Sequence, residues 1–215
     1  MIESNFMEGF IMDFDYQTEL EKYTRIWEMS EYRLFSPGAT LSRIFFSHFK
    51  NELKPFDRII DFGCGTARIA TQFLQKKLIV DLIDIAPNCL DEEIQNLMMF
   101  APIQFYQNTL WQLPESLEAA DWIYSADVLE HIPENKVEKS LKEMAKKTKK
   151  GGMLQIFLEK EKFKTGIDCD LHLTVKPRQW WIEKIEKYWN ILSISPEKAS
   201  RFRFIALVGA PHETN

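Results

Sequence analysis

The sequence predicts an α/β fold with a sheet of seven mostly parallel strands, helices on both faces and a helical segment ahead of it. From residue 57 onward, short apolar runs alternate with stretches of helical periodicity, as strands and helices do in a parallel sheet. One apolar run ends in an acid and leads into Gly63-Cys64-Gly65, the order of a strand, a tight turn and a helix start. A chain of 215 residues is also long enough for one domain with a substantial core.

Helical spacing of apolar side chains marks the N-terminal part of the chain. A helix is expected over residues 18–29, with one face formed by Leu20, Tyr23, Ile26 and Trp27. A second helix is expected over residues 36–49, with serine as its cap and proline at its first position. We expect residues 1–54 to form a helical lid over the glycine-rich turn, and residues 55–215 to form the domain that contains this turn.

The apolar runs and the periodic stretches between them predict the remaining elements. Strands are expected at residues 58–61, 78–84, 103–106, 121–125, 153–158, 191–194 and 202–208. Helices are expected at residues 66–76, 88–99, 133–149 and 177–189. The last strand follows its predecessor through a short turn, so it is predicted to run antiparallel.

The turn after the first strand is suited to holding a ligand. Glycine at 63 and 65 removes side chains that would keep the backbone away from a bound molecule. The third glycine of the dinucleotide fingerprint is replaced by Arg68, which argues against NAD and FAD because their pyrophosphate needs a bare helix start. The carboxylate of Asp61, at the end of the strand, can accept a hydrogen bond from an ammonium group.

These residues resemble the first motif of the class I S-adenosylmethionine-dependent methyltransferases. Its pattern, acid-x-Gly-x-Gly-x-Gly, maps onto Asp61, Gly63, Gly65 and Ala67, with alanine as a mild departure at the last position. The resemblance implies a Rossmann-like fold, S-adenosylmethionine as cofactor and methyltransferase activity. It also implies that the turn, with Cys64 between its two glycines, lies beside the methionine part of the cofactor.

Further cofactor-binding residues follow from the strand ends. Asp84 ends the second strand, 23 residues after Asp61, where an acid can bind both ribose hydroxyls. The resemblance implies that Ile85 touches the adenine. It also implies that Asn108, Thr109 and Leu110, which follow the third strand, bind the adenine. The amide of Asn108 replaces the acid that is often found there in the family.

Other positions are assigned to the neighbourhood of the sulfonium and the substrate. Ser125 and Ala126 end the fourth strand and would lie beneath the sulfonium. Tyr32 and Arg33 of the lid are expected to face the cofactor or the substrate, with Arg33 either pairing with the cofactor carboxylate or lying at the surface. Three tryptophans could line the substrate cavity or pack in the core, namely Trp180, Trp181 and Trp189.

A possible metal site follows the fourth strand. One helical turn would place Asp127, Glu130 and His131 on one face, at the sheet edge where ligands bind in such folds. His172 follows the fifth strand at the same edge. Two carboxylates and two imidazoles could hold a divalent cation, and the imidazoles favour Mn, Fe, Co or Zn over Mg.

This pattern is similar to two methyltransferase branches that bind a metal through acid-x-x-acid-His and a later histidine. One branch methylates the 3′-terminal ribose of small RNAs, and the other methylates catechol intermediates of ubiquinone synthesis. In the alternative without metal, His131 packs near the substrate and Glu130 caps the next helix. In both cases His131 is the candidate general base, because an imidazole with an unperturbed pKa of about 6.5 suits proton removal at neutral pH.

Composition narrows the class of protein. The net charge of −5 gives no general reason to expect nucleic acid, and the basic run at 146–150 is interpreted as a solvated helix end closed by Gly151 and Gly152. No apolar stretch approaches the roughly 20 residues of a membrane span, and the N-terminus lacks a secretory pattern. Three widely spaced cysteines argue against a disulfide framework or a cysteine-based zinc site. We therefore expect a cytoplasmic protein.

The sequence thus predicts a methyltransferase that acts on an oxygen of a small hydroxylated acceptor, phenolic or sugar-like. One alternative is an RNA ribose 2′-O-methyltransferase, which would need a basic groove. A second alternative is a non-catalytic binding or activating subunit with this fold. Degenerate cofactor loops would mark such a subunit, whereas Asp61, Gly63, Gly65 and Asp84 are all present.

Overall fold

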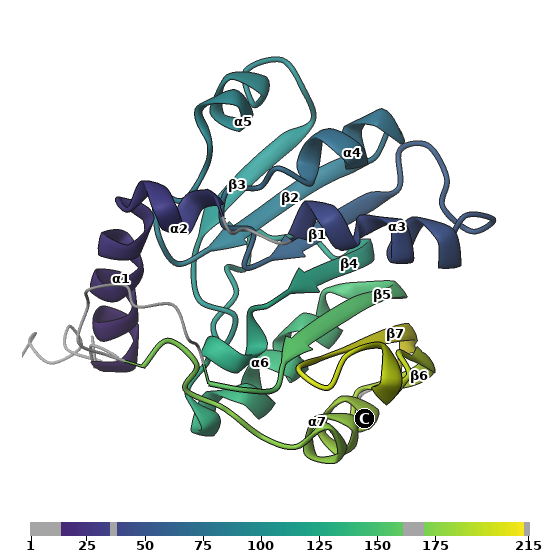
Figure 1. Cartoon of the computed structure of the whole chain (residues 1–215). Helices are drawn as coiled ribbons and strands as arrows, with labels where there is room; N and C mark the ends of the chain where they lie inside the picture. The colour runs from purple at the N-terminus through teal and green to yellow at the C-terminus, as the bar shows by residue number, and fades with distance from the viewer. Residues whose placement is uncertain (1–13, 35–37, 161–169, 213–215) are drawn as a thin grey trace, which may run out of the picture.

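Seven strands form one sheet in the order β3-β2-β1-β4-β5-β7-β6 (Figure 1). The computed structural model describes residues 14–34, 38–160 and 170–212. In chain order the strands are β1 (Arg58–Phe62), β2 (Ile79–Asp84), β3 (Ile103–Gln107), β4 (Ala120–Ala126), β5 (Thr148–Phe157), β6 (Trp189–Ile194) and β7 (Arg203–Pro211). Strands β1 to β5 pair in parallel, and β7 lies antiparallel between β5 and β6. The predicted seven-stranded, mostly parallel sheet and the antiparallel last strand are confirmed.

Helices cover both faces of the sheet. They are α1 (Phe14–Trp27), α2 (Ser30–Leu34), α3 (Gly38–His48), α4 (Ala70–Gln75), α5 (Glu92–Leu97), α6 (Glu134–Lys146) and α7 (Arg178–Glu186), with 3₁₀ turns η1 (Leu129–His131) and η2 (Glu197–Ala199). Because successive strand side chains point to opposite faces, Ile59 packs with Phe45 of α3 and Phe73 of α4. The next residue, Ile60, packs on the other face with Trp181 of α7.

The strand order places a binding crevice next to β1. Strand β1 pairs with β2 on one side and with β4 on the other, so the direction of winding reverses between β1 and β4. Ligands of open parallel sheets bind outside the carboxyl ends of the strands at such a reversal. Asp61 lies near the end of β1, level with Leu82 of β2 and Tyr124 of β4.

The helix after β1 is shorter than predicted. It was expected over residues 66–76, whereas α4 covers only Ala70–Gln75. Gly63, Gly65 and Ala67 have φ angles of 72°, 51° and 55°, which are left-handed conformations that no right-handed helix contains. The turn therefore extends past the second glycine, and the helix begins only after it.

The interpretation of the basic run as a helix end closed by glycines is wrong. Helix α6 ends at Lys146, and β5 begins at Thr148, so most of the run lies in a strand. A Cβ at Gly151 would lie 2.1 Å from the Val208 carbonyl oxygen, and one at Gly152 would lie 2.0 Å from that of Ile123. These glycines are needed for close strand approach.

The N-terminal helices divide between two tasks. Side chains of α1 and α2 border the main cavity, and Figure 1 shows α1 standing at one end of the sheet. Helix α3, in contrast, packs Phe45 against the sheet residues Trp122 and Tyr124. Helices α1 and α2, called the lid below for their place beside the cavity, thus differ from α3, which belongs to the layer that covers the sheet. None of the helices in the described part of the chain is both long and apolar enough to span a bilayer.

The aromatic cluster under α3 generates a stability prediction. Phe45 is fully buried, and its ring centroid lies 5.2 to 6.3 Å from those of Phe49, Phe73, Trp122 and Tyr124. Phe45→Ala should lower the free energy of unfolding by about 3–5 kcal/mol, because it removes apolar contacts and leaves a cavity. The measurement is urea denaturation, with Phe100→Ala at an 89% exposed side chain as the matched control. Equal losses in both variants would contradict this packing.

Candidate functional site

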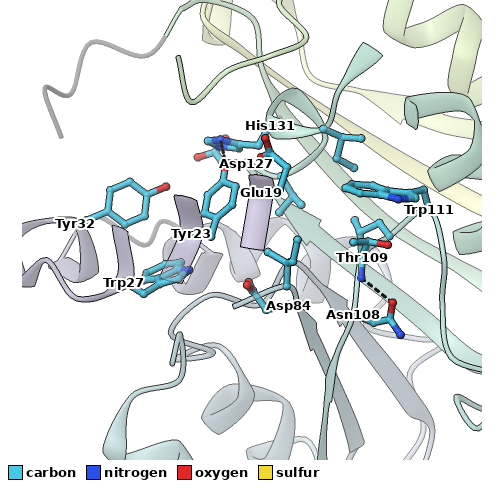
Figure 2. Close-up of a pocket in the computed structure, with 15 residues that line it drawn as sticks. Glu19, Tyr23, Trp27, Tyr32, Asp84, Asn108, Thr109, Trp111, Asp127 and His131 are labelled. Carbon is cyan, nitrogen blue, oxygen red and sulfur yellow. Dashed lines mark hydrogen bonds between the residues drawn. The ribbon is translucent and has the colours of Figure 1, made fainter. Parts of the chain in front are cut away.

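The main cavity opens at the carboxyl ends of the central strands, beneath α1 and α2 (Figure 2). Its volume is about 630 Å³, counted with the open solvent at its mouth. The sheet contributes Gly63, Asp84 and Ile85, and the segment after β3 contributes Asn108, Thr109, Leu110 and Trp111. The lid contributes Glu19, Tyr23, Trp27 and Tyr32, and the segment after β4 contributes Asp127, Val128, His131 and Ile132.

A smaller hollow adjoins the cavity at the end of β1. Its volume is about 290 Å³, open solvent included, and Gly63 borders both hollows. Its other lining residues are Ala39, Asp61, Cys64, Arg68, Ile69, Tyr124 and Ala126. The two predicted strand-end acids thus face adjoining hollows on either side of the glycine turn.

Gly63 is needed for a reason that the sequence did not reveal. A Cβ at this position would lie 2.4 and 2.5 Å from the two methyl carbons of Val128, and its φ of 72° also disfavours other residues. The predicted reason was close approach of the backbone to a ligand. In the structure a side chain of the protein itself occupies the space beside Gly63.

Asp61 is a buried carboxylate without a cation. Its side chain is 4% exposed, and among the described residues it has no hydrogen-bond or ion-pair partner. Burial raises its pKa to about 8, and the charge of Asp84 adds to this effect. The site therefore stabilises the ionised form of Asp61 only when a positive group enters the smaller hollow.

Asp84 ties the glycine turn to the end of β2. Its carboxylate accepts hydrogen bonds from the backbone N–H groups of Gly65 and Ala86, both at 3.0 Å. Burial nevertheless raises its pKa to about 6, against the lowering effect of these bonds. The carboxylate faces the main cavity, where its remaining lone pairs can accept further hydrogen bonds.

The nearby thiols are poor metal ligands. The side-chain donor atoms of Cys64, Asp84 and Cys89 lie within 4.8 Å of one another. Burial is the main cause that raises the pKa of both Cys64 and Cys89, and a protonated thiol does not bind metal ions well. Cys169 lies outside the described residues.

Most of the predicted cofactor residues border one of the hollows. Ile85, Asn108, Thr109 and Leu110 line the cavity, and Cys64 and Ala126 line the smaller hollow. Ser125 is fully buried and borders neither hollow. The alternative that the C-terminal tryptophans line the cavity is wrong, because Trp181 and Trp189 are fully buried in the core and Trp180 packs against it.

The prediction that Arg33 faces the cofactor is also wrong. Its guanidinium donates to the backbone carbonyls of Trp27, Asn88 and Leu90 at 2.8 to 3.1 Å. It also pairs with the carboxylate of Asp91 at 2.9 Å. Arg33 therefore fastens α2 to the loop after β2, and both of its terminal nitrogens donate within the protein.

Three of the four predicted metal ligands come together. Side-chain donor atoms of Glu130, His131 and His172 lie within 4.8 Å of one another. Asp127 is not part of this cluster, because its carboxylate accepts a hydrogen bond from Gln155 and pairs with Arg203 at 3.3 Å. Its φ of 54° breaks the helical turn that the sequence suggested.

Glu130 holds a carboxylate oxygen that lacks a partner. Its side chain is fully buried, Oε1 accepts a hydrogen bond from the Phe157 N–H at 3.0 Å, and Oε2 has no hydrogen-bond partner. Burial raises its pKa well above the ordinary value. The alternative in which Glu130 caps the next helix is wrong, since its carboxylate bonds to β5.

Backbone carbonyls orient both imidazoles. Nδ1 of His131 lies 3.1 Å from the Leu171 carbonyl oxygen, and Nδ1 of His172 lies 2.5 Å from that of Glu159. A carbonyl oxygen can only accept, so in each ring Nδ1 carries the proton and Nε2 carries the lone pair. The Tyr23 hydroxyl also contacts Nδ1 of His131, at 2.8 Å.

His131 does not retain the pKa on which its predicted role as general base depends. Burial lowers its pKa to about 3, with a further contribution from His172, whose ring centroid lies 4.6 Å away. The ring is therefore neutral at pH 7, and it is a much weaker base than an ordinary imidazole.

Sequence reasoning missed the cavity-facing row of α1. Glu19, Tyr23 and Trp27 recur every four residues, so they share one face of the helix. The helical spacing predicted Tyr23 and Trp27 on an apolar face of a lid helix but did not assign them to the site. Glu19, on the same face, is the signal that this face borders a cavity. Its carboxylate pairs with Lys22 at 2.5 Å, although both side chains are largely buried.

The sheet order, the glycine turn and the two strand-end acids define the class I, S-adenosylmethionine-dependent methyltransferase type of fold. Residues 59–152 match the family model described as a methyltransferase domain. This segment contains the glycine turn, both acids and Glu130 with His131. This part of the chain is therefore similar to a methyltransferase domain. No curated protein matches the chain in sequence.

Solved structures agree with this assignment. An S-adenosylmethionine-dependent methyltransferase from Clostridium acetobutylicum has a TM-score of 0.68 at 14% identity, over 89% of this chain and 99% of that chain. The N-methyltransferase NodS from Bradyrhizobium japonicum, solved with S-adenosylhomocysteine, has a TM-score of 0.64 at 16% identity, over 93% and 100%. A 1,6-didemethyltoxoflavin-N1-methyltransferase from Burkholderia thailandensis reaches 0.64 at 10% identity, over 99% and 94%. At these identities the likeness shows the fold.

The raised pKa of Asp61 generates a prediction of pH dependence. The folded protein keeps a proton on Asp61 up to a pH of about 8, whereas the unfolded chain releases it near a pH of about 4. The contribution of Asp61 to stability is therefore present below about pH 4 and is lost as the pH rises to about 8. Asp61→Asn removes this titration. The free energy of unfolding of the variant should therefore rise relative to that of the wild type as the pH increases through this range. Urea denaturation at several pH values measures the difference, and a difference that does not change with pH would contradict the assignment.

Proposed function

We propose that the protein transfers a methyl group from S-adenosylmethionine to an oxygen atom of a small hydroxylated acceptor, phenolic or sugar-like. The observation that carries this proposal is the pair of buried strand-end carboxylates on either side of Gly63. Asp61 lacks a cation, and Asp84 faces the main cavity. A ligand with an ammonium group and a ribose diol satisfies both.

The residues around the turn suit each part of this cofactor. Asp61 would accept a hydrogen bond from the ammonium group, and Asp84 would accept hydrogen bonds from the ribose hydroxyls. Ile85 and Leu110 offer apolar contacts to the adenine ring. Asn108 can accept from the adenine amino group through Oδ1, which already accepts the Thr109 N–H at 2.8 Å and keeps a second lone pair.

The acceptor would occupy the part of the cavity between α1 and the segment after β4. Tyr23, Glu19 and His131 point into this part (Figure 2). The sulfonium is an activated leaving group, so the main task of the protein is to align the acceptor oxygen with the methyl carbon. Such alignment contributes up to ~7–11 kcal/mol to lowering a barrier. Closure by α1 also excludes water from the reacting atoms.

We further propose that Glu130, His131 and His172 bind a divalent cation. Oε2 of Glu130 is buried without a partner, and both imidazoles present the Nε2 lone pair because backbone carbonyls hold their Nδ1 protons. The low pKa of His131 keeps it neutral, as ligation requires, whereas a bound cation would have to favour the ionised form of Glu130, whose pKa burial raises. Two nitrogens and one oxygen suit Mn, Fe, Co or Zn. A cation bound here would lower the pKa of a coordinated hydroxyl, which the neutral His131 does poorly by itself.

The structure offers less support for the two alternative functions. An RNA ribose methyltransferase would need free cations, but Lys146 and Lys150 pair with acids and Lys147 donates to a backbone carbonyl. A non-catalytic subunit would have no need of Asp61 and Asp84 at adjoining hollows. Two of the similar structures are N-methyltransferases, so a nitrogen acceptor is also to be tested.

Cofactor binding tests the main proposal. Isothermal calorimetry should detect S-adenosylmethionine binding by the wild type, and Asp84→Asn should weaken it by about tenfold or more, because a hydrogen bond to a charged group is worth roughly 1.5–3 kcal/mol. The matched control is Glu118→Gln, an exposed acid that pairs with Arg58 at the opposite end of β1. Absence of binding at millimolar cofactor would refute the proposal and favour the non-catalytic subunit.

Co²⁺ titration tests the metal site separately. The wild type should show a visible absorption band on binding Co²⁺, and His172→Ala and Glu130→Gln should each weaken binding by roughly 10–100-fold or more through loss of a ligand. Asp127→Asn should leave Co²⁺ affinity nearly unchanged, since its carboxylate is engaged by Gln155 and Arg203. Equal affinity in all four proteins would show that the cluster is not a metal site, whatever the result with the cofactor.

A further inference from the structure

A surface rich in positive charge lies on α3, α4 and the loops that follow these two helices. Its cations are exposed, and none of the described residues forms an ion pair with them. They are Arg43, Lys50, Lys54, Lys76 and Lys77. Glu52 is the one acid within residues 38–56 and 70–77, although the whole chain has a net charge of −5. Positive charge is therefore concentrated here, and we call this region the basic surface.

Most of the basic surface lies at the amino ends of the central strands, away from the main cavity. Residues 49–57 precede β1 and residues 76–78 precede β2, whereas the cavity opens at the carboxyl ends of these strands. The two loops are joined, because the Phe56 N–H donates to the Lys77 carbonyl at 2.7 Å. Figure 1 shows the loop after α3 and the lid helix α1 at opposite ends of the molecule.

An exposed aromatic side chain, Phe56, belongs to the same surface. It is 76% exposed, and its φ of 70° is a left-handed conformation that a bulky residue rarely adopts. Pro55 beside it is exposed as well, and Ile44 on α3 is 39% exposed. The backbone strain and the exposure of the ring both lower stability. A partner that buries the ring would remove the second penalty.

An anionic lipid bilayer fits both features of this surface. Its headgroups attract lysine and arginine side chains, and its acyl region accepts an apolar ring. RNA would also attract the cations, but an RNA acceptor would have to reach the main cavity. The residues that line this cavity include no lysine or arginine. An RNA acceptor would therefore lack cations where its reacting nucleotide lies.

We propose that the basic surface docks the protein on an anionic lipid bilayer, with the Phe56 ring inserted between the lipids and the cations at the level of the headgroups. Such docking is peripheral and requires no helix that spans the bilayer. Because the main cavity lies at the other end of the central strands, docking leaves its mouth uncovered. This docking does not depend on the proposed function, so a failure of the cofactor test leaves it standing.

Vesicle co-sedimentation with the full chain tests this docking. The probes are vesicles of phosphatidylcholine alone and vesicles that also contain phosphatidylglycerol. The wild type should bind only the anionic vesicles, and salt should weaken this binding. Phe56→Ser should weaken it by about tenfold or more, because the variant loses the apolar ring that enters the lipid. Lys54→Gln combined with Lys77→Gln should weaken it by roughly 25-fold, because each cation near an anionic surface contributes about fivefold.

The matched controls change the same residue types elsewhere on the molecule. Phe100→Ser alters a side chain that is 89% exposed, within residues 91–119, which include no lysine or arginine. Lys139→Gln combined with Lys142→Gln removes two exposed cations from α6, which packs on the other face of the sheet. Both controls should bind anionic vesicles as the wild type does. The urea midpoint of Phe56→Ser should not fall, because the ring is mostly exposed.

Three outcomes would overturn the inference. The first is equal binding of the wild type to both kinds of vesicle. The second is an equal effect of Phe56→Ser and Phe100→Ser, including no effect of either. The third is binding of transfer RNA by the wild type without binding of any vesicle, which would assign the basic surface to nucleic acid.

Discussion

The tight turn after β1 is the constraint on which the site depends. The N–H groups of Gly63 and Cys64 both donate to the Ile83 carbonyl, at 2.8 and 2.9 Å, and Gly65 donates to Asp84. These bonds join the turn to the end of β2 and hold two strand-end acids near each other in a dry environment. Burial raises the pKa of both Asp61 and Asp84, and the charge of Asp84 adds to the effect on Asp61. A cationic, hydroxyl-bearing ligand, as proposed above, would favour the ionised form of these two acids.

Unsatisfied polar atoms at this edge of the sheet form a consistent pattern. Asp61 lacks a cation, Oε2 of Glu130 lacks a donor, and Nε1 of Trp27 lacks an acceptor. Each one costs stability in the unliganded protein, and each comes from a different part of the chain. Their chemistry differs as well, because Asp61 and Glu130 are acids whereas Trp27 offers only a hydrogen-bond donor. The proposed cofactor and the proposed cation would satisfy the two acids.

His131 lies where the sequence predicted, but its environment does not give it the basicity that its predicted role requires. The imidazole lies at the cavity wall, as the sequence indicated, but burial and His172 lower its pKa to about 3. A base of this strength removes few protons from an acceptor hydroxyl at neutral pH. The same neutrality, with the proton held on Nδ1 by the Leu171 carbonyl, suits a metal ligand. Desolvation therefore favours ligation over proton transfer at this residue.

The sequence by itself determined the sheet, the glycine turn and the strand-end acids, because these depend on local periodicity and on residues next to each other along the chain. It also identified Glu130, His131 and His172, which share one sheet edge by topology. Only the tertiary structure decided that Asp127 turns to Gln155 and Arg203, that Arg33 is engaged by backbone carbonyls, and that Trp27 faces the cavity. The reason is physical: side-chain partners and desolvation come from segments distant in sequence, which no local pattern records.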